Sequence, residues 1–92
     1  MKKGNNPKLE GILNEVGMPY FTMAVSHLFD VGYRNMTEES VKETVEELKS
    51  KEEKPNAIMT NDFMIYIIEA AYKISQAASI LDLVKFTSKY IN

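Results

Sequence analysis

The strongest constraint on the fold is a run of six apolar residues, 63–68, inside a segment that contains neither glycine nor proline, residues 60–90. Nothing in that segment breaks a helix, and Thr60 is a residue type that caps a helix start. Because the run is apolar on the whole circumference of a helix, it has to be buried on several sides. The sequence predicts an all-α fold centred on a long hydrophobic C-terminal helix.

The continuity of this helix depends on its polar residues. They recur at a mean spacing of about 3.3 residues, 20 residues over six intervals, against about 3.6 for a straight α-helix, so the polar row drifts around the helix. Either the helix breaks near residues 75–79, where Ser79 would cap a separate final helix, or its two halves bury different faces. The row consists of Glu69, Lys73, Gln76, Ser79, Asp82, Lys85 and Lys89.

Three further helices are expected before this segment. Residues 9–16 carry apolar side chains at helical spacing and end at Gly17, and residues 19–31 form a second helix that ends at Gly32. Thr37 caps a third helix that continues to about Lys54. The expected inner faces are Phe21, Ala24, Val25 and Leu28, with Phe29 beside them, on the second helix, and Val41, Val45 and Leu48 on the third.

These elements predict a bundle-like domain of four helices, or five if the last one breaks. The length of 92 residues suits one domain, so we expect a flexible N-terminal segment over residues 1–8 and a single all-α domain over residues 9–92. A turn is expected at residues 54–56. Residues 50–59 lack the alternation of strands, which disfavours a two-stranded wing there.

The residue types present exclude several kinds of active site. The chain has no cysteine and a single histidine, His27, which removes thiol nucleophiles, thiolate zinc sites and sites that need two imidazoles. His27 and Asp30 lie within one helical turn and could form a base with its orienting carboxylate, but no nucleophile motif or phosphate loop accompanies them. We therefore expect no enzymatic activity, no cofactor and no metal, and interpret His27 as a surface residue.

Targeting signals are not evident in the sequence. No apolar stretch follows the lysines near the N-terminus, as a signal peptide would require. Glu69, Lys73 and Asp82 interrupt the most apolar segment, which disfavours a membrane span. The absence of cysteine suits a reducing compartment, so the expected localisation is cytoplasmic.

The apolar run also predicts self-association. A domain of four or five short helices is expected to cover about half of the circumference of such a run, which favours a homodimer over a monomer with this helix at its centre. Ile65 and Ile68 lie on one edge and Phe63, Ile67 and Ala71 on another, so one set is expected in the core and the other at the interface. The candidate partner or dimer interface is Phe63, Met64, Ile65, Ile67, Ile68 and Ala71.

The third helix carries most of the negative charge. Residues 37–54 contain 7 acidic and 4 basic side chains, a balance of -3, whereas the whole chain has a net charge of -2. An acidic helix face steers basic partners towards it, although most such faces are solvated surface. The candidate docking residues for a basic partner are Glu39, Glu43, Glu46 and Glu47.

Two stretches resemble DNA-binding domains. Residues 17–24, Gly-Met-Pro-Tyr-Phe-Thr-Met-Ala, look like the turn and second helix of helix-turn-helix domains, and residues 36–48 are similar to the third helix of winged-helix domains. The first resemblance implies that Tyr20, Phe21 and Val25 would face DNA, without any arginine or lysine among them. The second would present an acidic helix to the phosphates.

The expected function is therefore that of a small, non-enzymatic regulatory protein, an adaptor, inhibitor or regulatory subunit that docks to another protein. The alternative is a dimeric helix-turn-helix or winged-helix-like DNA-binding regulator, for which nucleic acid is the less favoured partner.

Overall fold

The computed structural model describes residues 6–52 and 59–89, and these residues are helical and contain no strand. The elements in chain order are α1 (Pro7–Val16), α2 (Met18–Val31), a short 3-10 helix η1 (Tyr33–Asn35), α3 (Glu38–Ser50), α4 (Asn61–Ala77) and α5 (Ile80–Thr87). The all-α prediction is confirmed, with five α-helices in the described residues. The turn expected at residues 54–56 lies outside the described residues.

The long C-terminal helix is not found, because the segment breaks into α4 and α5, as in the predicted alternative of a break near residues 75–79. Ala78 adopts an extended conformation, with φ -156° and ψ 154°. The Ser79 hydroxyl then accepts a hydrogen bond from the Asp82 backbone N–H at 3.2 Å and caps α5. A serine side chain competes with the helix for backbone donors, so the break needs neither glycine nor proline.

The other helix boundaries follow local signals. Asn6 caps α1 through its side chain, which accepts the Leu9 N–H at 3.1 Å, so Pro7 and Lys8 belong to the helix and not to the N-terminal segment predicted over residues 1–8. Residues 1–5 lie outside the described residues. Gly17 (φ 89°) and Gly32 (φ 96°) end α1 and α2 in a conformation that favours glycine.

The capping prediction for α3 is confirmed in detail. The Thr37 hydroxyl accepts the Ser40 N–H at 3.1 Å, and the Ser40 hydroxyl accepts the Thr37 N–H at 3.2 Å. This reciprocal pair satisfies two of the backbone donors that a helix start leaves free. Thr60 likewise caps α4 by accepting the Phe63 N–H at 3.0 Å.

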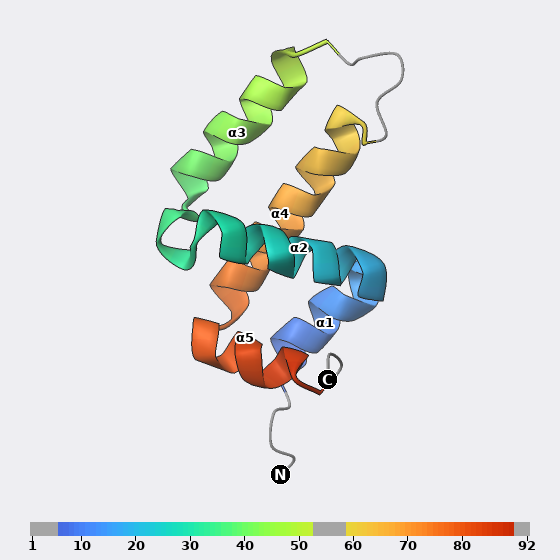
Figure 1. The fold of residues 1–92 in the computed structure, drawn as a ribbon, viewed down its shortest axis with the longest axis vertical. Coiled ribbons are helices and arrows are strands. Elements are labelled where there is room, and N and C mark those ends of the chain that lie inside the picture. The colour runs from blue at the N-terminus through green and yellow to red at the C-terminus, as the bar shows by residue number, and fades with distance from the viewer. Residues whose placement is uncertain (1–5, 53–58, 90–92) are drawn as a thin grey trace.

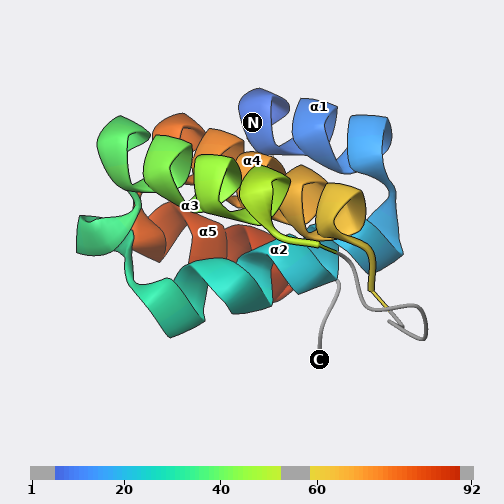
Figure 2. The same cartoon turned by 90° about the horizontal axis from the view of Figure 1, so that it is seen from above.

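Helix α4 is the centre of the structure and contacts α1, α2 and α3. In Figure 1, α3 runs alongside the first half of α4 and α2 crosses in front of it. Figure 2 shows α1, α3 and α4 in one layer, with α2 and α5 beneath them. The break after α4 lets α5 turn back beneath the bundle.

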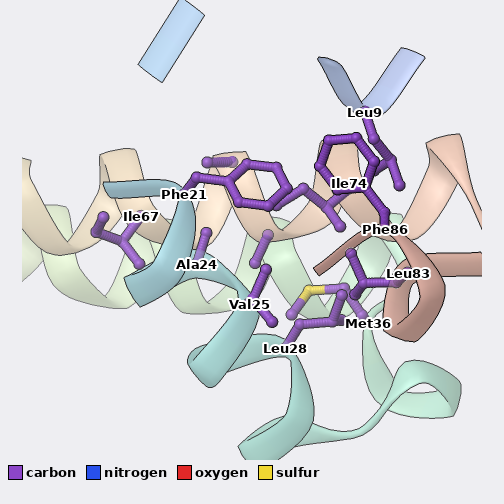
Figure 3. Packing of buried hydrophobic residues seen from close by; sticks show 12 residues of the cluster. Leu9, Phe21, Ala24, Val25, Leu28, Met36, Ile67, Ile74, Leu83 and Phe86 are labelled. Carbon is purple, nitrogen blue, oxygen red and sulfur yellow. The ribbon is translucent and has the colours of Figure 1, made fainter. Parts of the chain in front are cut away.

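Two clusters of buried apolar side chains hold the helices together. The larger joins α1, α2, α4 and α5, and Figure 3 shows Phe21, Ile74 and Phe86 packed side by side beneath Leu9. The rings of Phe21 and Phe86 lie 5.8 Å apart. The smaller cluster joins α3 to α4 through Val45, Ile65 and Ile68, with Val41 and Leu48 at its edge. The predicted inner faces of α2 and α3 are confirmed, whereas Phe29 is exposed.

Candidate functional site

A groove lies between α2 and the first half of α4. Its cavity has a volume of about 380 Å³. Side chains of α2 spaced one turn apart form one wall, and apolar side chains of α4 form the floor. The lining residues are Thr22, Met23, Ser26, His27 and Asp30 of α2, Met59 before α4, and Met64, Ile67 and Ile68 of α4.

Three methionines make part of the groove lining apolar and deformable. Met23, Met59 and Met64 are three of the six methionines in the chain, and they converge here from two helices and the segment before α4. A methionine side chain is unbranched and polarizable, so a methionine-lined surface adapts to differently shaped apolar partners. Nothing local in the sequence indicates that α2 and α4 bring these methionines together.

The α2 wall of the groove is polar and ends in a negative charge. Asp30 lies in the last turn of α2, which contains no basic residue. The C-terminal end of a helix is the negative end of its dipole, so a carboxylate there is unfavourable for the helix itself. Within the described residues, Asp30 makes no hydrogen bond or ion pair, and none joins it to His27. The base and orienting carboxylate considered from the sequence are therefore not assembled.

Helix α3 packs beside α4 but contributes no residue to the lining of the groove. Val45 of α3 packs against Ile65 and Ile68 of α4. Lys42, Glu46 and Lys49 lie on one flank of this contact, where they share a hollow with Glu69 and Tyr72 of α4. At about 3.6 residues per turn, Thr44 falls on the opposite flank of α3, whereas Glu47 falls on its outer side, nearly opposite Val45.

The four predicted acidic docking residues are all exposed. Glu39, Glu43 and Glu47 lie on the side of α3 that faces away from the buried stripe of Val41, Val45 and Leu48, and Glu46 lies on the flank beside Glu69. None of the four forms an ion pair within residues 6–52 and 59–89. They remain candidate residues for a basic partner.

The structure places most of the predicted dimer interface inside the chain's own core. Ile65, Ile67, Ile68 and Ala71 are between 0 and 8% exposed, and Phe63 and Met64 are half-buried. Self-association through the apolar run stays a prediction, but the chain itself covers four of the six predicted interface residues. The reason is that α2 covers Ile67 and Ala71 while α3 covers Ile65 and Ile68 from another side.

Some of the predicted interface residues nevertheless reach the surface. Met64, Ile67 and Ile68 line the groove. Phe63 makes an edge contact with the exposed ring of Tyr20, at 5.4 Å between ring centroids, and Tyr66 contacts the same ring at 5.8 Å. The apolar run therefore contributes a groove floor and an aromatic edge rather than a continuous flat interface.

The helix-turn-helix resemblance is not supported by the positions of its reading residues. Phe21 and Val25 are 3% and 7% exposed and belong to the main core, so they cannot contact DNA bases while the domain is folded. Gly17 alone separates α1 from α2. In the winged-helix resemblance, the third helix presents the four glutamates to solvent, and residues 53–58 of the possible wing lie outside the described part of the chain.

Comparison with known proteins gives no match: no protein-family model, no curated protein and no solved structure is significantly similar to this chain. Within the described residues, no group of three or more histidine, cysteine, aspartate or glutamate side chains is arranged to hold a metal ion. None of the described helices combines the length and apolar character that a bilayer crossing requires.

Proposed function

We propose that this protein is a cytoplasmic, non-enzymatic docking protein whose groove between α2 and α4 receives the apolar face of a helix. The observation that supports this most directly is the convergence of Met23, Met59 and Met64 on an open groove with a polar wall. Amphipathic helices bind in such grooves through apolar side chains repeated every three or four residues. Methionine-rich linings are a common way to accept them.

A helix suits this site better than an extended peptide. Strand addition needs a free sheet edge, and residues 6–52 and 59–89 contain no strand that could offer one. A volume of about 380 Å³ is near the lower end of the ~300–1,000 Å³ typical of small-molecule pockets. Because the groove is partly open to solvent, side chains of a partner helix can enter it.

The charge around the groove favours a basic helix. Asp30 lines the groove, and the exposed glutamates of α3, which packs against another side of α4, add to the negative charge of the domain. Complementary charge of this kind increases the rate of association and selects among partners more than it strengthens binding. We therefore propose a partner helix that carries lysine or arginine beside its apolar face.

A model peptide tests this proposal without knowledge of the natural partner. The probe is a capped helical peptide of leucine, alanine and lysine, titrated into isotope-labelled protein while amide chemical shifts are recorded. We expect shifts at the residues that line the groove, and we expect Met64→Glu to remove them. Tyr66→Glu is the matched control, because Tyr66 lies on the same helix but outside the groove.

Shifts confined to other surfaces, or shifts unaffected by Met64→Glu in a folded variant, would contradict the proposal. Circular dichroism of each variant establishes that it is folded. Met64 is half-buried at the groove surface, which makes a charged residue there easier to accommodate than at the fully buried Ile74.

A further inference from the structure

The outer side of α5 exposes three large apolar side chains. Ile80, Leu81 and Val84 are 49%, 61% and 48% exposed, and Leu81 is the most exposed large apolar residue in the described chain. Leu83 and Phe86 on the other side of the same helix are fully buried. Helix α5 is therefore apolar on both sides, although the core needs only one of them.

The outer side of α5 combines apolar side chains with a positive charge, which complements an apolar groove that carries a negative charge. Lys85 follows Leu81 by four residues, which places a positive charge one turn after the apolar group on the same side of α5. The groove also combines the two kinds of group, because methionines and the carboxylate of Asp30 both line it. We propose that α5 of a second copy of this chain occupies the groove, with Leu81 among the methionines and Lys85 beside Asp30. This inference rests on the proposed function of the groove as a helix-binding site.

The contact has to join two chains. Within one chain, α5 is anchored to the core by Leu83 and Phe86, beneath the second half of α4. The groove is lined by Met64, Ile67 and Ile68, which belong to the first half of α4. Figure 1 shows α5 at the lower end of the molecule, beyond the other end of α4. The exposed side chains of α5 also point away from the core, so they cannot reach the groove of their own chain without unfolding.

Asp30 provides the second argument. Its carboxylate opposes the dipole of α2 and has no partner within the described residues. A lysine from another chain would neutralise the carboxylate at the end of the helix where negative charge is unfavourable. The position of Asp30, unhelpful to its own helix, is explained if it serves an intermolecular contact.

The proposed contact is heterologous, because a helix of one chain meets a groove of the other. Two chains can exchange helices reciprocally and close a dimer, or successive chains can associate head to tail. Three side chains in one groove bury less than the ~800 Å² per partner of a standard stable interface. We therefore expect reversible association whose extent rises with protein concentration.

Sedimentation equilibrium of the full chain, at concentrations from about 10 µM to about 1 mM, tests the inference. We expect the average mass to rise above that of one chain across this range, and we expect Leu81→Glu to remain at the mass of one chain. Phe29→Glu is the matched control, because Phe29 is 44% exposed but lies outside both the groove and α5. It is expected to associate as the unmodified chain does.

Variants that swap the two charges test whether Asp30 and Lys85 contact each other. Asp30→Lys and Lys85→Asp are each expected to weaken association at least tenfold, and the double variant is expected to regain most of it. Asp30→Lys places a favourable charge at the end of α2, so thermal unfolding should show no loss of stability. Glu43→Lys, which makes the same charge change on the outer face of α3, is expected to have little effect.

The mass of one chain at all concentrations would overturn this inference, and so would association that persists in folded Leu81→Glu. In either case the proposed function is judged separately by the model peptide. If that peptide binds the groove while the chain stays monomeric, the helix-binding function stands and the occupant is a different protein.

Discussion

Replacing Tyr33 by phenylalanine is expected to stabilise this protein. Tyr33 lies in η1 and packs against the main core, and its hydroxyl is buried with no hydrogen-bond partner in the described residues. A buried polar group without a partner costs about 1–3 kcal/mol of desolvation. Removal of the hydroxyl is therefore expected to raise the free energy of unfolding by about 1 kcal/mol, which corresponds to a rise of about 4–8 °C in Tm for a domain of this size.

The buried hydroxyl of Tyr33 also predicts that the free energy of unfolding depends on pH. Burial, and secondarily the negative charge of Asp82, raise the pKa of Tyr33 from 10.0 to about 12. Between these two values the unfolded chain loses the phenolic proton while the folded chain keeps it, so stability falls as the pH rises. Relative to Tyr33→Phe, the stability of the unmodified chain is constant below pH 10 and falls as the pH rises towards 12. The advantage of Tyr33→Phe should therefore grow over this interval.

Urea unfolding followed by circular dichroism, at neutral pH and at several alkaline pH values, measures both effects. The difference in tyrosinate absorbance between the unmodified chain and Tyr33→Phe gives the titration of this one residue among five tyrosines. Asp82→Asn should lower the pKa of Tyr33 only in part, because burial is the larger cause. A loss of more than about 1 kcal/mol in Tyr33→Phe at neutral pH would refute the reasoning, since it would mean that the hydroxyl has a favourable partner.

Three further outcomes are expected. Ser79→Ala should lower the free energy of unfolding by about 1 kcal/mol in urea unfolding, because Ser79 caps α5, whereas Ser88→Ala beyond the end of that helix should have little effect. Phe86→Ala should cost about 3–5 kcal/mol in the same assay, because the ring is fully buried against Phe21, and a loss below about 1 kcal/mol would show that α5 is not anchored there. Fluorescence anisotropy with duplex DNA at physiological salt should detect no binding, and sequence-specific micromolar affinity would restore the DNA-binding alternative.

Local signals account for the parts of the fold that the sequence predicts. Thr37, Thr60 and Ser79 are polar caps placed directly before helices, and each accepts the expected backbone hydrogen bond. Such signals act within three residues and do not depend on what the helix later packs against. The polar row that begins at Glu69 drifts around the helix. This drift indicates either a break near residues 75–79 or a helix whose two halves bury different faces. The choice between them depends on tertiary packing.

The groove illustrates what the sequence does not contain. Met23 and Met64 are far apart in the chain, and each is equally suited to fill a gap in the core. Their convergence depends on the crossing of α2 over α4, which no local pattern specifies. The burial of both Ile65 and Ile67 has the same origin, because it requires α2 and α3 to approach α4 from different sides.

The break at Ala78 explains both which side chains of α5 are buried and which are exposed. At about 3.6 residues per turn, a continuous helix would place Leu83 on the side opposite Ile74, and Phe86 about 120° from Ile74. Neither side chain could then join Ile74 in the cluster that all three form. The extended residue redirects the chain so that Leu83 and Phe86 enter the core, and the same change of direction turns Ile80, Leu81 and Val84 outwards. A sequence selected for the core alone would place polar residues at those three positions, so their apolar character indicates a second partner for α5.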